Sequence, residues 1–450
     1  MPCPGRPCNP RAGPGRVGGA HPPPADRADS GIVTTDGAAG PRRLGTGFRR
    51  LFASSTGSNL ADGMLQAALP LVAASLTRDP LLVSLVASLA FLPWLLFAIP
   101  AGALVDRIDR RRAMQGANLA RAAILLGLAV ALATGWASIG VLYVAAFLLG
   151  VAETVYDNAA RALLPRVVRR DQLERGNSLL STAESVSNLF LGAPLGALLF
   201  ALTAVLPLGA AIAMYVVAAT LVVTVRGSFA PERGAPTTLA ADIREGLGWL
   251  LHHRILRQLV WVTGLGAFGY SVANGIAVLF ALDVLGIDEA AFGLLLAAMG
   301  VGAVLGALLS PALTRLLGRT AAMGVSGTLC GATLVGIGLW PALWVTLVLW
   351  PLGALAVSAF NVQVMSVRQV LIPDALFGRV QGAYRTVLWG SIPLGSVSGG
   401  VVASLVDLPS AMVFGGALAT VAGLGTWWVL GVHRREIAAA FLREDDPLRA

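Results

Sequence analysis

The sequence predicts an all-α integral membrane protein with twelve transmembrane helices arranged as two six-helix halves. Three observations support this prediction: the composition, the number of long apolar runs, and the placement of the arginines. Of the 450 residues, 56% are hydrophobic and only 13% are charged, and the mean hydropathy is +0.74. A soluble domain carries about 25% charged residues, so this composition indicates a membrane protein.

Twelve runs are long and apolar enough to be membrane spans, since a helix needs about 20 mostly apolar residues to cross about 30 Å of hydrocarbon. They lie at about 51–75, 81–104, 113–134, 138–159, 177–200, 204–225, 256–282, 291–313, 320–339, 342–365, 380–405 and 410–431. Residues 226–255 form the longest break between runs, and six runs lie on each side of it.

The segments outside the spans are more polar. Residues 1–44 are rich in proline, glycine and arginine and cannot bury a core, so we expect a disordered tail there; whether they are translated stays open. In the central break, Leu239, Ile243, Leu247 and Leu250 recur at helical spacing, which predicts an amphipathic helix at the membrane interface. The expected organisation is a cytoplasmic tail (1–44), a first half (45–225), a cytoplasmic linker (226–255), a second half (256–431) and a cytoplasmic C-terminal tail (432–450).

The arginines predict how the chain is oriented in the membrane. If the N-terminus is cytoplasmic, the inner loops hold arginines at 107–112, 161–175, 226–257, 315, 319, 368 and 379. The outer loops hold one arginine, Arg78. This asymmetry follows the positive-inside rule and predicts a multi-pass protein of the inner membrane with both termini cytoplasmic. Contact with anionic lipid also explains the net charge of +9, so we expect no nucleic-acid partner.

The two halves repeat each other in sequence. The stretch DQLERGNSLLSTAESVSNLFLGAPLGALL, from Asp171, aligns with DALFGRVQGAYRTVLWGSIPLGSVSGGVV, from Asp374. In this alignment Gly192 falls on Gly395 and Gly196 falls on Gly399. Two repeated six-helix halves are typical of secondary transporters, in which one half moves against the other.

The loop GALVDRIDRRR, from Gly102, completes the pattern. With it, the chain resembles the major facilitator superfamily, whose signature between the second and third helices reads G-x-x-x-D-R/K-x-G-R/K-R/K. Asp109 stands where the family has glycine, and the matching residues are Gly102, Asp106, Arg107, Arg110 and Arg111. Over about residues 45–430, stretches such as SNLADGMLQAALPLVAASLT resemble the branch that contains the enterobactin exporters and the macrolide efflux proteins.

The resemblance implies the major facilitator fold and two functional motifs. The arginine loop is expected to gate the cytoplasmic side, with Asp106 pairing with Arg161 or a neighbouring helix end; a topology signal alone is the alternative. The fifth helix of family antiporters carries G-P-x-x-G-G, and LGAPLGAL keeps Gly192, Pro194 and Gly196, with alanine before the proline and at the last position.

Asp62 lies near the middle of the first span. A charge at that depth costs about 2.5–3.5 kcal/mol on insertion scales, so the side chain should face a cavity or a partner. Burial disfavours the charged form of a carboxyl group, which makes a reversible proton carrier feasible. A structural hydrogen bond between helices is the alternative.

Further ionisable residues lie on the other spans of the first half. Glu153, Asp157 and Arg161 are spaced i, i+4, i+8 on one face of the fourth span. Glu153 is the deepest, and both acids join Asp62 as candidates for proton coupling, although Asp157 and Arg161 are expected to form a salt bridge. Arg121 and Glu184 form a second candidate buried pair.

These features predict a monomeric secondary transporter that exports a small hydrophobic or amphipathic compound, such as a drug, macrolide or siderophore-like molecule, in exchange for protons. An uptake symporter of the same fold is the first alternative. A non-transporting receptor and an integral membrane enzyme are alternatives of another class. The chain has no HExxH motif, no GxxxxGK[ST] stretch and no histidine within a span, so we expect no enzymatic activity, metal or cofactor.

Overall fold

The computed structural model describes residues 44–105, 107–169, 172–226, 239–373 and 376–444, and all the regular secondary structure in these ranges is helical, as predicted. Parts of the predicted tails (1–43 and 445–450) and Asp106 of the arginine loop lie outside the described residues. The first half comprises α1 (Thr46–Leu76), α2 (Pro80–Val105), α3 (Arg110–Ala133), α4 (Ile139–Val167), α5 (Leu173–Ser185), η2 (Val186–Gly192), α6 (Ala193–Leu202) and α7 (Leu206–Val223).

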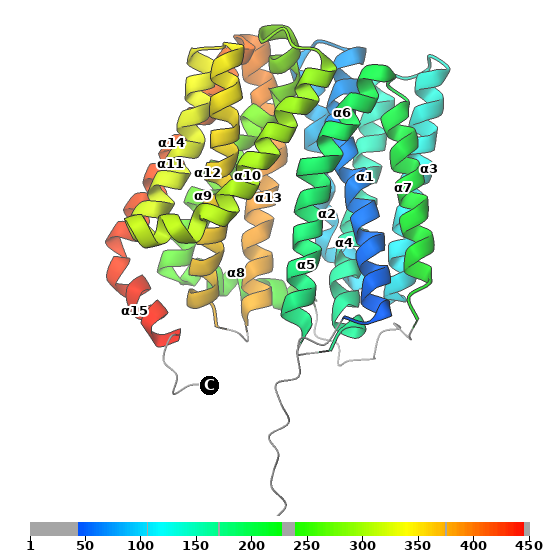
Figure 1. Cartoon of the computed structure of the whole chain (residues 1–450). Helices are drawn as coiled ribbons and strands as arrows, with labels where there is room; N and C mark the ends of the chain where they lie inside the picture. Colours follow the sequence, from blue (N-terminus) through cyan, green and yellow to red (C-terminus); the bar gives the residue numbers. More distant parts are fainter. Residues whose placement is uncertain (1–43, 106, 170–171, 227–238, 374–375, 445–450) are drawn as a thin grey trace, which may run out of the picture. The chain divides into compact units, whose positions relative to one another are not determined.

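The second half follows the amphipathic segment, where α8 (Leu239–His252) is found (Figure 1). Its helices are α9 (Arg254–Leu279), η3 (Phe280–Val284), α10 (Glu289–Leu317), α11 (Arg319–Leu339), α12 (Leu343–Leu371), α13 (Phe377–Leu405) and α14 (Leu408–Val432). A short α15 (Arg434–Glu444) ends the described chain, in the segment assigned to the C-terminal tail.

Eleven helical segments in the described residues are long and apolar enough to cross a membrane. The remaining predicted span is α1, which has 31 residues but carries several serines, Asn59 and Asp62. α1 packs against α4, α5, α6 and α7, so much of its surface faces protein rather than lipid. A helix in that position can carry polar residues that a lipid-facing helix could not.

The fifth span is interrupted, because it consists of α5, the π-helical η2 and α6. Pro194 is the second residue of α6. Proline has no N–H to donate to the preceding turn, and the wide turn of η2 ends two residues before it, at Gly192. The sequence motif around Pro194 thus coincides with the point at which the helix geometry changes.

The helix ends form two sides, which we name by their loops. The arginine-rich side holds the loops after α2, α4, α10 and α12, and the arginine-poor side holds those before α2, α4, α7, α10, α12 and α14. On the arginine-poor side, one buried apolar core contains residues of both halves, among them Leu71, Val86, Phe200, Leu279 and Phe292.

The arginine-rich side is built differently. There the first half has its own core, around Leu51, Met114 and Leu163. The second half has a separate core, around Leu259 and Val367. The halves are therefore joined by shared packing on the arginine-poor side and packed independently on the arginine-rich side.

Candidate functional site

A buried ion pair lies at the centre of the first half. Asp62 of α1 and Arg121 of α3 are 3.3 Å apart, measured from the carboxylate Oδ1 to the guanidinium Nη1. The Arg121 side chain is 1% exposed and that of Asp62 is 15% exposed. The Tyr215 hydroxyl of α7 donates a hydrogen bond to the same Asp62 oxygen. Three helices are thus connected through one carboxylate.

Polar and aromatic groups surround the Arg121 guanidinium. Its Nη1 also donates to the Ser58 hydroxyl (3.2 Å), which in turn donates to the Asn118 side-chain oxygen (3.1 Å). The rings of Tyr156 and Tyr215 lie 5.1 and 5.2 Å from the guanidinium carbon. A desolvated cation over an aromatic face gains about 2 kcal/mol, so the two rings help to stabilise a charge that has left water.

The ionisable residues of α4 continue this group toward the arginine-rich side. Asp157 and Arg161 of α4 form an ion pair of 3.5 Å and are partly exposed. Glu153, two turns before Arg161, is half-buried and interacts electrostatically with Asp62, Asp157 and Glu184. Arg121 is the one cation among its principal electrostatic neighbours, and Arg121 is already paired with Asp62.

One expected pair is not formed. Arg121 pairs with Asp62, not with Glu184, whose side chain is exposed on α5. Glu184 instead interacts electrostatically with Arg161 and with Arg385 of α13. Arg121 and Glu184 do not meet because Arg121 is directed into the bundle toward α1 and α7, whereas Glu184 lies toward the second half.

The antiporter-like motif lies directly beside Asp62. A Cβ atom at Gly192 would overlap the backbone of Gly63, and one at Gly196 would overlap the backbone of Met64. Both glycines therefore let α6 and the end of η2 approach the stretch of α1 that carries Asp62. Pro194, between them, is buried in the same contact region.

The arginine loop is described in part. Gly102 lies in the last turn of α2, and Asp106 lies outside the described residues. Arg107 is exposed, and two nitrogens of Arg110 are buried without a hydrogen-bond partner among the described residues. Arg111 Nη1 donates to the carbonyls of Val223 (3.3 Å) and Val225 (3.0 Å).

These contacts give the loop a structural role at two helix ends. Arg111 satisfies carbonyls at the C-terminus of α7, where a cation is also favoured by the helix dipole. Asp109, at the position where the family has glycine, is the N-cap of α3 and accepts from the backbone N–H groups of Arg111 (2.9 Å) and Arg112 (3.2 Å). The departure from the family pattern therefore supplies a helix cap.

Sequence reasoning did not identify Ser58, Asn118, Tyr156 and Tyr215 as part of the site. Tyr215 places a hydroxyl in an otherwise apolar run, and Tyr156 directly precedes Asp157; these were the available signals. It also did not pair Trp94 of α2 with Trp389 of α13, whose rings lie 4.3 Å apart, or Arg385 with the face of Trp389, at 4.2 Å.

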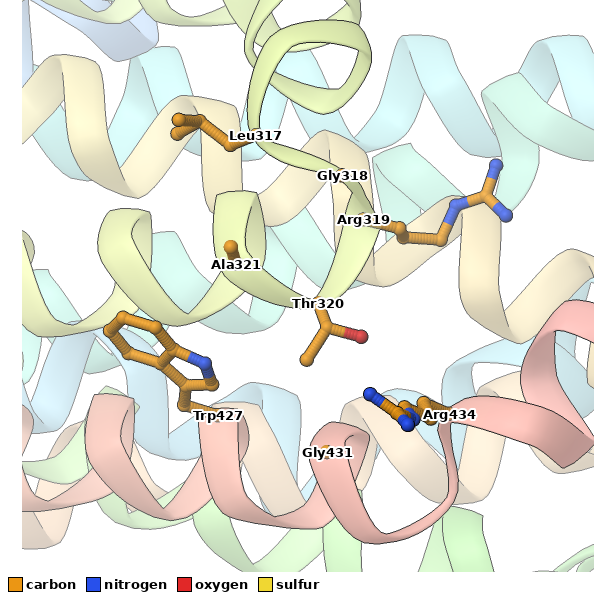
Figure 2. Close-up of a pocket in the computed structure, with 8 residues that line it drawn as sticks. All are labelled: Leu317, Gly318, Arg319, Thr320, Ala321, Trp427, Gly431 and Arg434. Carbon is orange, nitrogen blue, oxygen red and sulfur yellow. The ribbon is translucent and has the colours of Figure 1, made fainter.

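A surface pocket lies elsewhere, on the arginine-rich side of the second half (Figure 2). It is formed by the ends of α10 and α14 and the starts of α11 and α15, and its lining residues include Gly318, Thr320, Trp427 and Arg434. None of the residues of the Asp62–Arg121 network lines it. Within the described part of the chain, no group of three or more His, Cys, Asp or Glu side chains is placed to hold a metal ion.

Sequence relatives of this chain are transporters. An uncharacterised MFS-type transporter of Mycobacterium tuberculosis is 30% identical over 409 residues, which cover 85% of this chain and 91% of the relative. The multidrug efflux pump Tap of Mycolicibacterium fortuitum is 28% identical, covering 80% and 89%. Macrolide efflux protein A of Streptococcus pyogenes is 26% identical, covering 63% and 72%.

Solved structures share the fold at low sequence identity. A bacterial homologue of the iron transporter ferroportin in an inward-facing state matches with a TM-score of 0.70 and 13% identity, covering 85% of this chain and 98% of that one. An outward-facing structure of a bacterial ferroportin homologue gives a TM-score of 0.56 at 16% identity, covering 86% and 99%. The family described as transmembrane secretion effector matches residues 38–439. The chain therefore belongs to the major facilitator superfamily and is a membrane transporter, as the motifs of its sequence predicted.

Proposed function

We propose that this transporter exports a small hydrophobic or amphipathic compound across the inner membrane in exchange for protons, with Glu153 carrying the proton. The observation that supports the proposal most strongly is the position of Glu153: a half-buried carboxyl group beside the Asp62–Arg121 ion pair, with no ion-pair partner of its own among the described residues. The arginine-rich side would face the cytoplasm, following the positive-inside rule.

The sequence alone favours Asp62 as the proton carrier, whereas the contacts of the two acids support Glu153. Protonation of Asp62 would leave the Arg121 guanidinium buried without its counterion, and breaking a buried ion pair by neutralising one partner costs about 3–5 kcal/mol. Protonation of Glu153 breaks no ion pair seen in the described residues. Glu153 can therefore bind and release a proton while the Asp62–Arg121 pair holds α1, α3 and α7 together.

Export is supported by the relatives and by the energy available. Tap and macrolide efflux protein A are efflux proteins. Entry of one proton releases about 2.3 kcal/mol per 100 mV, and a tenfold concentration ratio requires about 1.4 kcal/mol. One proton per cycle is therefore sufficient to maintain more than a tenfold gradient of an uncharged compound. The glycines of the antiporter-like motif also pack beside Asp62, with which Glu153 interacts electrostatically.

The test compares two kinds of transport by the purified protein in proteoliposomes. Radiolabelled erythromycin, a macrolide, and ethidium, an amphipathic dye, serve as probes. Glu153→Gln mimics the protonated side chain, so we expect it to lose accumulation driven by an imposed pH gradient and to keep counterflow exchange without a gradient. Glu289→Gln, an isosteric change at the arginine-poor end of α10, is the matched control and should keep both activities.

Two outcomes would contradict the assignment. Uphill transport by Glu153→Gln at the rate of the parent protein would exclude Glu153 as the proton carrier. If Asp62→Asn loses uphill transport and keeps counterflow, the proton belongs to Asp62. Direction is measured separately in membrane vesicles: accumulation in everted vesicles supports export, and accumulation only in right-side-out vesicles would indicate an uptake symporter.

A further inference from the structure

The arginine-poor side carries one arginine, and its contact crosses between the two halves. Arg78 lies in the short loop between α1 and α2. Its Nη1 atom is 2.8 Å from Oδ1 of Asp283, which lies in η3 at the end of the first helical span of the second half. The one arginine in the loops of the arginine-poor side therefore forms an ion pair that connects the two halves.

Other contacts between the halves occur on the same side. Gly400 of α13 lies so close to the start of α2 that a Cβ atom there would overlap the Ser84 side chain and approach Leu81. A Cβ atom at Gly293 of α10 would likewise overlap the Ala197 side chain of α6. Together with the apolar core that contains residues of both halves, these contacts close the arginine-poor side.

The corresponding region of the arginine-rich side has separate cores for the two halves. A transporter that alternates between two open sides must break the contacts of the closed side once in every cycle. The Arg78–Asp283 bridge is among the contacts that have to separate, because its two residues belong to different halves.

We propose that the Arg78–Asp283 bridge holds the arginine-poor side closed and sets how often that side opens. Both side chains are partly exposed, at 57% and 38%, so solvent screens their attraction, and an exposed pair shifts a two-state equilibrium by about fivefold at most. A weak bridge suits this role, since it favours the closed state without preventing opening. The inference requires alternating access and does not depend on which acid carries the proton.

The experiment measures opening directly with a buried reporter. Ser84 is fully buried against Gly400, so Ser84→Cys, placed in a background without Cys3, Cys8 and Cys330, should react with a maleimide only when the arginine-poor side opens. The full chain is studied in lipid nanodiscs, where reagent reaches both sides. We expect Asp283→Asn and Arg78→Gln each to raise the labelling rate about two- to fivefold at low salt.

Two comparisons make the result specific to the pair. Glu289→Gln removes a nearby negative charge that has no ion-pair partner among the described residues, and it should leave the rate unchanged. Exchanging the charges, with Arg78→Asp and Asp283→Arg together, should restore the slow rate of the parent. Unchanged labelling in both single variants, or an exchanged pair that labels as fast as they do, would overturn the proposal.

A cross-link provides a second, independent measurement. Cysteines introduced at positions 78 and 283 are joined by a short bifunctional thiol reagent with a reducible linker. The joined protein should stop transporting ethidium and recover when the linker is reduced. Normal transport by the fully cross-linked protein would show that residues 78 and 283 need not separate, and the proposed role would be wrong.

Discussion

In the first half the packed interior holds an aspartate, an arginine and a glutamate, whereas the interior of the second half holds an arginine, tyrosine and threonine but, among the described residues, no carboxylate. The close glycine contacts place the two halves in register, because Gly196 packs on Met64 and Gly399 packs on Val272. Asp62, two residues before Met64, therefore corresponds to Tyr270, two residues before Val272.

The second half has a buried arginine, but its setting differs. Arg368 of α12 lies over the ring of Tyr384, at 4.3 Å, and the Tyr384 hydroxyl is 2.6 Å from that of Thr263. No carboxylate pairs with Arg368 among the described residues. The two halves therefore share their helix packing, while the interior carboxylates of the described residues lie in the first half. This arrangement is expected if the first half couples the proton and the second half mainly moves against it.

The largest effect should come from separating the buried pair of the first half. Asp62→Asn leaves the Arg121 charge without its counterion, so we expect a loss of about 3–5 kcal/mol of folding stability. Asp62→Asn combined with Arg121→Gln removes both charges and should recover a substantial part of that loss. Thermal unfolding in detergent, followed by size-exclusion chromatography, measures both; a double variant no more stable than Asp62→Asn would show that the pair is not what holds these helices.

The sequence was sufficient to predict the helices, the two halves and their register, because apolar length and arginine placement are local properties of the chain. It also identified Asp62, Arg121 and Glu153 as residues of interest. It did not predict which of them pair. Spacing predicts partners along one helix, as for Asp157 and Arg161, but the contact between Asp62 and Arg121 depends on how α1 and α3 each pack against α7.

An intermediate effect is expected at the N-cap of α3, which differs from the N-cap of α11 in the second half. Asp109 caps α3 with its side chain, whereas Gly318, at the start of α11, has no capping side chain and a φ of 75°. Asp109→Ala should destabilise the protein by about 1 kcal/mol, measured as a lower unfolding temperature.

Asp109→Asn is the control for this cap, since asparagine accepts the same backbone hydrogen bonds and should cost much less. Equal destabilisation by Asp109→Ala and Asp109→Asn would mean that the charge of Asp109, and not its cap, supports the loop. That result would weaken the contrast with Gly318, where the helix begins without any side-chain acceptor.

The smallest effect is expected at the buried arginine of the second half. Arg368→Met keeps an unbranched apolar stem in place of the arginine stem and removes a charge that has no carboxylate partner in the described residues, so no counterion is left behind. We expect a stability change within about 1 kcal/mol and uphill transport close to that of the parent. A loss as large as that of Asp62→Asn would mean that the second half also depends on a buried charge.

The apolar core that joins the halves on the arginine-poor side has a thermal consequence. Opening that side would bring buried leucine, valine and phenylalanine side chains into contact with water, and apolar hydration raises the heat capacity. The equilibrium between the two open forms would then be a curved function of temperature. Hydrophobic association weakens on cooling. If closure of the arginine-rich side buries less apolar surface than this opening exposes, cold would favour the form in which this core is separated, and the resting distribution of the transporter would depend on the temperature of the cell.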